Sequence, residues 1–191
     1  MAERSGYWTV VDGQPVSKQD AETAWAEAAR VRLGEVAASY HATIEYGALA
    51  DEIQVSSGIR SRVPMRHWIG GVLGDVARGN RDHAAPPLTA LVVQAGTGMV
   101  GDGYDEVLRL AGMVPIHDPV EREDHAATAR LECYRWAGAE LPPGGGRPAL
   151  APRLRAARER AARLRRPSSP PNLCPTCSIA MPVTGVCDSC S

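Results

Sequence analysis

Hydrophobic residues recur with helical spacing along most of the chain, and each repeat predicts a helix. The first helix is expected after Ser17, which is followed by Asp20 in a pattern that resembles a capping box. About twenty alanine-rich residues follow, so this helix should be long. A β-rich run at residues 7–11 precedes it and leads into Asp12 and Gly13, which predict a turn.

Two shorter helical repeats occupy the middle of the chain. In the first, Ile44 and Ile53 belong to one apolar face, and Thr43 is expected to supply the N-cap oxygen. In the second, Pro64 suits the first helical turn, and apolar residues recur at helical spacing over residues 68–76. Between the two repeats, serine and glycine residues predict a turn.

A β-rich run at residues 88–93 comes next, followed by four glycines between residues 96 and 103. Such a run before closely spaced glycines predicts a β-hairpin. Helix, turn, helix and hairpin in this order are the layout of a winged helix, which is common among DNA-binding domains.

Four short motifs in this stretch resemble, in the same order, the DNA-binding domain of the alkylguanine-DNA alkyltransferases and alkyltransferase-like proteins. The segment EYGALA at 45–50 resembles the family's TYGELA, and HWIG at 67–70 resembles its RAVG. LTALVV at 88–93 resembles PCHRVV, and VGDGY at 100–104 resembles the glycine-rich turn that ends in GY. The resemblance covers about sixty of the 191 residues and implies a winged-helix domain that binds DNA.

The chain departs from this family at the reacting residues. The acceptor cysteine of the family would fall at Thr89, and the histidine that follows it would fall at Ala90. Alkyl transfer needs a low-pKa thiolate beside a base, and neither group is present at these positions. We therefore expect the DNA-binding shape without the reaction, that is, a non-enzymatic protein.

The resemblance also implies roles for individual residues. In the family, an arginine on the recognition helix holds the duplex open while the target base is flipped. Arg66 is the nearest candidate here, although His67 occupies the matching position. Tyr46 matches the family tyrosine that contacts the DNA backbone near the extruded base; the alternative is a half-buried helix residue.

Arginines are concentrated around the second of these helices. Between residues 60 and 81 only Asp75 opposes five arginines, which gives a local charge of +4. The five are Arg60, Arg62, Arg66, Arg78 and Arg81. They predict a surface that contacts phosphates. The alternative is a solvated helix face in a chain that uses twenty arginines and one lysine.

The region from His117 to His125 is rich in histidine and acidic residues and would be the candidate site if the chain were an enzyme. Asp118 followed by Pro119 is, however, typical of a helix start, where acidic side chains complement the helix dipole. We therefore expect these residues to form the start of a helix and not a catalytic site.

Charge divides the chain into two parts. Residues 1–146 hold 13 basic and 20 acidic residues, a net charge of −7, whereas residues 147–191 hold 8 and 2, a net charge of +6. Prolines and glycines over residues 141–153 predict a linker, and residues 151–166 predict a helix with seven arginines. Arg155 and Arg158 on this helix are candidate phosphate contacts. A helix of this kind can also bind an anionic membrane or an acidic protein surface, including the body of this chain.

Two CxxC pairs near the C-terminus form the most specific motif. They are Cys174 with Cys177 and Cys187 with Cys190, separated by nine residues. Four thiolates at this spacing predict one tetrahedral Zn²⁺ site, structural because no position is left open for water.

Together these observations predict an α+β protein with four parts. Residues 1–42 form a hairpin and a long helix, and 43–140 form the alkyltransferase-like winged-helix domain. Residues 141–172 form a linker that contains the basic helix, and 173–191 form a zinc ribbon. We expect a cytoplasmic DNA-binding protein with no membrane segment, in which the ribbon or the basic helix assists DNA or partner binding. A protein–protein adaptor is the alternative.

Overall fold

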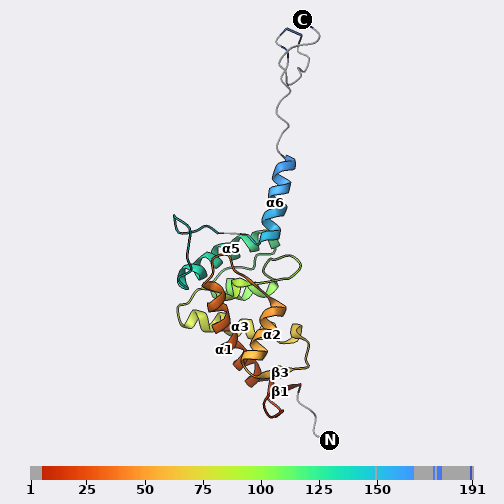
Figure 1. Cartoon of the computed structure of the whole chain (residues 1–191), viewed down its shortest axis with the longest axis vertical. Coiled ribbons are helices and arrows are strands. Elements are labelled where there is room, and N and C mark those ends of the chain that lie inside the picture. The colour runs from red at the N-terminus through yellow and green to blue at the C-terminus, as the bar shows by residue number, and fades with distance from the viewer. Residues whose placement is uncertain (1–5, 149, 166–173, 175, 178–189, 191) are drawn as a thin grey trace. The chain divides into compact units, whose positions relative to one another are not determined.

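In the computed structural model, residues 6–148, 150–165, 174, 176–177 and 190 are described, and this part of the chain is α+β. It contains six α-helices, three short 3₁₀ turns and two sheets of two strands each (Figure 1). The chain forms two units, residues 1–155 and 156–191. The predicted α+β class is confirmed at this level.

The N-terminal residues form the strand and the capped helix that the sequence predicts. Strand β1 (Tyr7–Thr9) leads through a turn to α1 (Lys18–Ala37). Ser17 Oγ accepts a hydrogen bond from the Asp20 backbone N–H at 3.1 Å and donates one to the Asp20 carboxylate at 2.7 Å. This reciprocal arrangement confirms the capping box.

Strand β1 also makes a pairing that local sequence patterns do not reveal. It runs antiparallel to β3 (Ile59–Ser61), with Trp8 opposite Arg60. Figure 1 shows this small sheet at the end of the first unit that is nearest the N-terminus. The pairing joins the first strand of the chain to the segment that carries the predicted DNA-binding arginines.

The main core lies where α1 packs against α2 (Tyr46–Ser56) and α3 (Ile69–Asp82). At its centre the rings of Trp25 and Trp68 lie 4.3 Å apart, and both side chains are almost completely buried. The Trp25 indole N–H donates to the Ile59 carbonyl at 3.2 Å, so the one polar atom of this ring is satisfied.

Helix α2 begins later than predicted, and the expected N-cap at Thr43 is wrong. Ile44 and Glu45 form strand β2, which pairs in parallel with β4 (Val92–Val93). Burial of Ile44 against Val92 extends the backbone there, so the helix starts at Tyr46 without a side-chain cap.

The predicted second helix is divided at its start. A 3₁₀ turn, η1 (Met65–His67), follows Pro64, and α3 begins only at Ile69. Trp68 separates them with φ −133°. Its buried indole N–H donates to the Val63 carbonyl at 3.0 Å. In one continuous helix from Pro64, the Trp68 side chain would not reach this carbonyl in the same way.

The predicted β-hairpin is wrong in the described part of the chain. Residues Leu88–Leu91 form a buried 3₁₀ turn, η2, and the two-residue strand β4 pairs with β2 instead of with a returning strand. A tight turn follows, in which the Gln94 N–H donates to the Met99 carbonyl at 2.9 Å. Because four consecutive side chains of η2 are buried, they cannot alternate between two faces as a hairpin strand requires.

The remaining elements form a second, smaller core. The turn η3 (Asp102–Tyr104) leads into α4 (Asp105–Leu110), and α5 (Pro119–Trp136) packs against η2. Asp118 caps α5 by accepting from the N–H groups of Val120 and Glu121, which confirms the predicted helix start.

The basic helix is present as α6 (Pro152–Arg165), close to its predicted bounds. Within the described residues, no helix has the length and apolar character needed to cross a bilayer. The predicted zinc ribbon falls mostly outside the described residues; Cys187 is among those not described.

Candidate nucleic-acid interface and metal centre

Two of the predicted arginines are positioned by the β1–β3 sheet. Arg60 lies in β3, and Arg62, two residues further, leaves the chain on the same side. The Arg62 backbone N–H donates to the Gly6 carbonyl at 3.0 Å, which continues the pairing past the end of the strand. The Arg62 guanidinium lies over the Trp8 ring at 5.1 Å, a cation–π contact that leaves its charge available.

Arg66 and His67 are presented by the η1 turn. The Pro64 carbonyl accepts from the His67 N–H at 3.0 Å, and the next residue, Trp68, is anchored in the core. A buried anchor immediately after the turn leaves Arg66 and His67 exposed to solvent. Arg60, Arg62, Arg66 and His67 therefore lie on β3, on η1 and on the short segment between them, which we call the β3–η1 edge.

The arginines of this edge carry uncompensated charge. Among the residues that the structure describes, no carboxylate lies within 4.0 Å of Arg60, Arg62 or Arg66. Each guanidinium can therefore meet a phosphate without first breaking an ion pair.

Arg78 does not belong to this group. It pairs with Asp75 on its own helix and with Glu106 of α4 at 3.2 Å. The hydrogen bond to Asp75 is the main reason that the pKa of Arg78 is raised. Arg81 is exposed at the last turn of α3, and a helix of 14 residues is about 21 Å long. The five predicted arginines are thus split between the two ends of α3.

Tyr46 lies at the start of α2 and is partly buried against the main core. Burial raises the pKa of its hydroxyl, and a hydrogen bond with the Gly101 backbone acts in the opposite direction. A Cβ atom at position 101 would come within 3.0 Å of the Tyr46 hydroxyl. A side chain at position 101 would therefore crowd this contact, which joins two of the four motifs of the resemblance.

Two buried polar side chains have no hydrogen-bond partner among the described residues. They are Asn80, which is 1 % exposed and lacks partners for both amide atoms, and the hydroxyl of Thr89. Asn80 lines a cavity of about 330 Å³ with Arg81 and the apolar side chains of α4. The sequence also places Asn80 among the arginines of residues 60–81 as a neutral donor, but the structure buries it on the apolar face of α3, four positions after Val76.

A buried ion pair connects α5 to the rest of the first unit. Arg130 and Glu123 are 2 % and 0 % exposed, and their side chains meet at 2.6 Å and 2.9 Å. Glu123 also accepts from the N–H groups of Val100 at 3.0 Å and Ala151 at 3.2 Å, and Arg130 donates to the Ala90 carbonyl at 2.8 Å. Glu123 is therefore a buried structural residue, whereas Glu121 is the acidic residue in the first turn of α5 that the sequence predicts.

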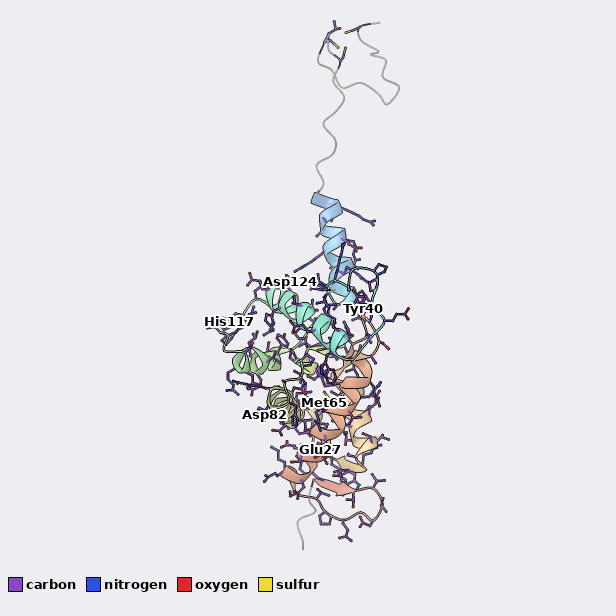
Figure 2. All side chains as sticks on the ribbon, turned by 90° about the vertical axis from the view of Figure 1, so that its left-hand side faces the viewer. Glu27, Tyr40, Met65, Asp82, His117 and Asp124 are labelled. Carbon is purple, nitrogen blue, oxygen red and sulfur yellow. The ribbon has the colours of Figure 1, made fainter. Side chains whose placement is uncertain are left out.

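The side chains from His117 to His125 do not form one cluster. His125 Nδ1 lies 2.9 Å from the Tyr104 hydroxyl, Glu123 is bonded to Arg130, and Asp118 caps the helix. Figure 2 shows His117 in the loop before α5 and Asp124 on the helix, apart from each other. Asp118, Glu123 and His125 thus each engage a different partner.

Arg155 and Arg158, the predicted contacts on the basic helix, occupy positions in the first three turns of α6. Arg155 is exposed, and Arg158 is partly buried. The structure places Arg155 beside a cavity of the first unit, which is described below.

The C-terminal cysteines gather as a metal site requires. The thiol groups of Cys174, Cys177 and Cys190 lie within 4.8 Å of one another, and the sulfur atoms of Cys174 and Cys190 are 4.0 Å apart. Sulfur atoms around a tetrahedral Zn²⁺ at about 2.3 Å would be about 3.8 Å apart, so the donor set fits this ion. Cys133 differs, because burial raises the pKa of its thiol to about 12 and disfavours a thiolate.

No protein-family model, curated protein or solved structure matches the chain.

Proposed function

We propose that the chain is a non-enzymatic DNA-binding protein of the alkyltransferase-like type, whose central domain has the two helices of a winged helix, α2 and α3, but no β-hairpin among its described residues. The observation that carries the proposal is the β3–η1 edge, where the exposed Arg62 and Arg66 and the partly buried Arg60 have no carboxylate partner among the described residues. Phosphate contacts of this kind supply most of the non-specific affinity for duplex DNA.

The parallel pairing of β2 with β4 gives further support. It places the segment before Tyr46 beside the segment after Thr89, so two motifs that are more than forty residues apart become neighbours. Thr89 is buried and provides no thiol, which favours binding without alkyl transfer. Because Arg78 is already paired with two carboxylates, we assign the main contacts to Arg60, Arg62 and Arg66.

The test is fluorescence anisotropy of the full chain with a labelled duplex across a salt series. We expect the logarithm of the affinity to fall with the logarithm of the salt concentration by about 0.9 per neutralised phosphate. The double replacement Arg62→Gln, Arg66→Gln should then weaken binding at every sequence and reduce the slope by about 1.8.

Arg78→Gln is the matched control, because it removes the same charge from the same region but from an arginine that is already paired. Replacing Arg160 and Arg163 by glutamine tests the basic helix separately. If the Arg62→Gln, Arg66→Gln double variant weakens DNA binding no more than Arg78→Gln does, the β3–η1 edge is not the interface. If no variant, including the unchanged chain, binds in a salt-dependent way, the adaptor alternative is favoured.

We further propose that the C-terminal cysteines hold one structural Zn²⁺. Cys174, Cys177 and Cys190 would hold it together with Cys187, which completes the second CxxC pair. A site closed by four thiolates supplies folding energy and leaves no open position for substrate.

Removal of the metal should therefore affect the tail and spare the helical unit. We expect one zinc per chain by elemental analysis, and its loss in a Cys174→Ser, Cys177→Ser variant. The far-ultraviolet circular dichroism and the unfolding midpoint of the helices should change little, because the main core contains none of these cysteines. Fewer than about half an equivalent of zinc in the unchanged chain would contradict the assignment.

A further inference from the structure

A cavity of about 630 Å³ lies in the first unit, between the end of α1 and the proline- and glycine-rich residues 142–148. The residues that shape it include Tyr40, His41, Pro142, Arg147 and Arg155. Figure 2 shows Tyr40 beside α5, and its ring lies 5.6 Å from that of Tyr134. The volume is within the range typical of small-molecule sites.

The wall of this cavity is held by specific bonds. The Tyr40 hydroxyl accepts from the Arg147 N–H at 2.9 Å and lies 3.1 Å from the Arg147 carbonyl, to which it donates. Arg135 donates to the Gly145 carbonyl at 2.9 Å and 3.2 Å. At Gly146, which has φ +75°, an added Cβ would meet Leu131 at 3.0 Å and the Tyr40 hydroxyl at 3.1 Å. Only glycine therefore lets the segment approach this closely.

The two charged side chains that line the cavity, Arg147 and Arg155, are both positive. Arg147, Arg155 and His41 line it, and none of the described lining residues is an aspartate or a glutamate. This is unusual in a body where acidic residues outnumber basic ones. His41 also adopts φ +69°, a strained conformation for a residue other than glycine, and such strain is concentrated at functional sites.

We propose that this cavity binds the phosphate group of a small ligand. Arg147 and Arg155 pair with the phosphate oxygens, as planar guanidinium groups do well, and His41 adds a hydrogen bond. The Tyr40 ring and the neighbouring prolines offer an apolar wall for the remainder of an organic phosphate. The proposal is independent of the β3–η1 edge, because the cavity shares no residue with it.

The state of His41 is consistent with this role. Burial, and secondarily the positive charge of Arg155, lower the pKa of its imidazole. At neutral pH the ring is therefore neutral and retains one N–H donor for a phosphate oxygen.

The probes are inorganic phosphate, pyrophosphate and AMP, titrated into the full chain and followed by calorimetry and by the His41 ring resonances. We expect saturable binding and a shift of the His41 signals but not of the His83 signals. Arg155→Gln and Arg147→Gln should each weaken binding about tenfold or more. Both variants keep the backbone bonds of residue 147. Arg30→Gln, which makes the same charge change away from the cavity, should have no effect.

The three probes identify the source of the phosphate. Tighter binding of AMP than of inorganic phosphate assigns the cavity to an organic phosphate, and equal binding assigns it to the free ion. The proposal is overturned if no probe saturates, or if Arg30→Gln weakens binding as much as Arg155→Gln does. The Arg62→Gln, Arg66→Gln variant should retain AMP affinity, so failure of the DNA proposal and failure of this one are separate results.

Discussion

Replacing Arg130 by methionine is expected to lower the free energy of unfolding by about 3–5 kcal/mol. The substitution leaves the Glu123 carboxylate completely buried, with only the N–H groups of Val100 and Ala151 to stabilise its charge. It also removes the donor to the Ala90 carbonyl. An uncompensated buried charge is among the most costly changes that a single substitution can make.

Urea unfolding followed by circular dichroism measures this effect. Arg109→Met is the control, because Arg109 forms an exposed ion pair with Glu106 on a single helix. Its unfolding midpoint should change little, since exposed ion pairs contribute little. The double replacement Glu123→Leu, Arg130→Met should recover part of the lost stability by removing both charges. With the single variant Glu123→Leu, the change in unfolding free energy of the double variant minus the sum of the two single changes measures the coupling of the pair. It should not recover the whole loss, because three backbone groups lose partners.

An equal loss in the Arg130 and Arg109 variants would show that the buried pair does not hold α5 in place. Hydrogen exchange provides an independent readout. The amide protons of Val100 and Ala151 should exchange faster in the Arg130 variant, because their acceptor becomes mobile.

The sequence predicted those features that are determined within a few residues. The capping box of Ser17 and Asp20 and the N-cap at Asp118 both form as expected. Each depends on hydrogen bonds that span three residues or fewer, so the local pattern contains the full physical cause. The long α1 helix and the basic α6 helix follow from periodicity and composition in the same way.

Contacts between distant segments account for the failures. The parallel pairing of Ile44 with Val92 displaces the start of α2, and nothing near Thr43 indicates it. The same pairing takes the strand that a hairpin would have used. The buried Glu123 illustrates the limit most clearly, because its partner Arg130 is seven residues away but its other bonds reach residues 100 and 151.

Contacts between distant segments also explain why the candidate interface was predicted only in part. The sequence places Arg62, Arg66 and Arg78 in one basic cluster, with Asp75 as the only nearby acid. The structure brings Glu106, 28 residues further along the chain, against Arg78. Charge counts along a sequence do not include such partners. Only the folded structure distinguishes Arg62 and Arg66, which have no carboxylate partner among the described residues, from Arg78, which has two.

Replacing Trp68 by alanine is expected to lower the free energy of unfolding by about 3–5 kcal/mol. The side chain is 2 % exposed and its ring centroid lies 4.3 Å from that of Trp25, so its removal leaves a large cavity at the centre of the main core. Trp136→Ala is the matched control, because Trp136 is 54 % exposed, and its loss should change stability by no more than about 0.5 kcal/mol.

Trp68→Phe separates the packing from the hydrogen bond. It keeps an aromatic ring but loses the donor to the Val63 carbonyl, which should cost about 1 kcal/mol plus the smaller loss of volume. That hydrogen bond fixes the chain on either side of η1, where Arg66 and His67 are presented. If this turn positions them for DNA, the phenylalanine variant should remain folded yet bind duplex more weakly, whereas Trp136→Ala should not. Unchanged affinity in a folded Trp68→Phe variant would show that the geometry of η1 is not needed, and would leave only the charge of the β3–η1 edge to explain binding.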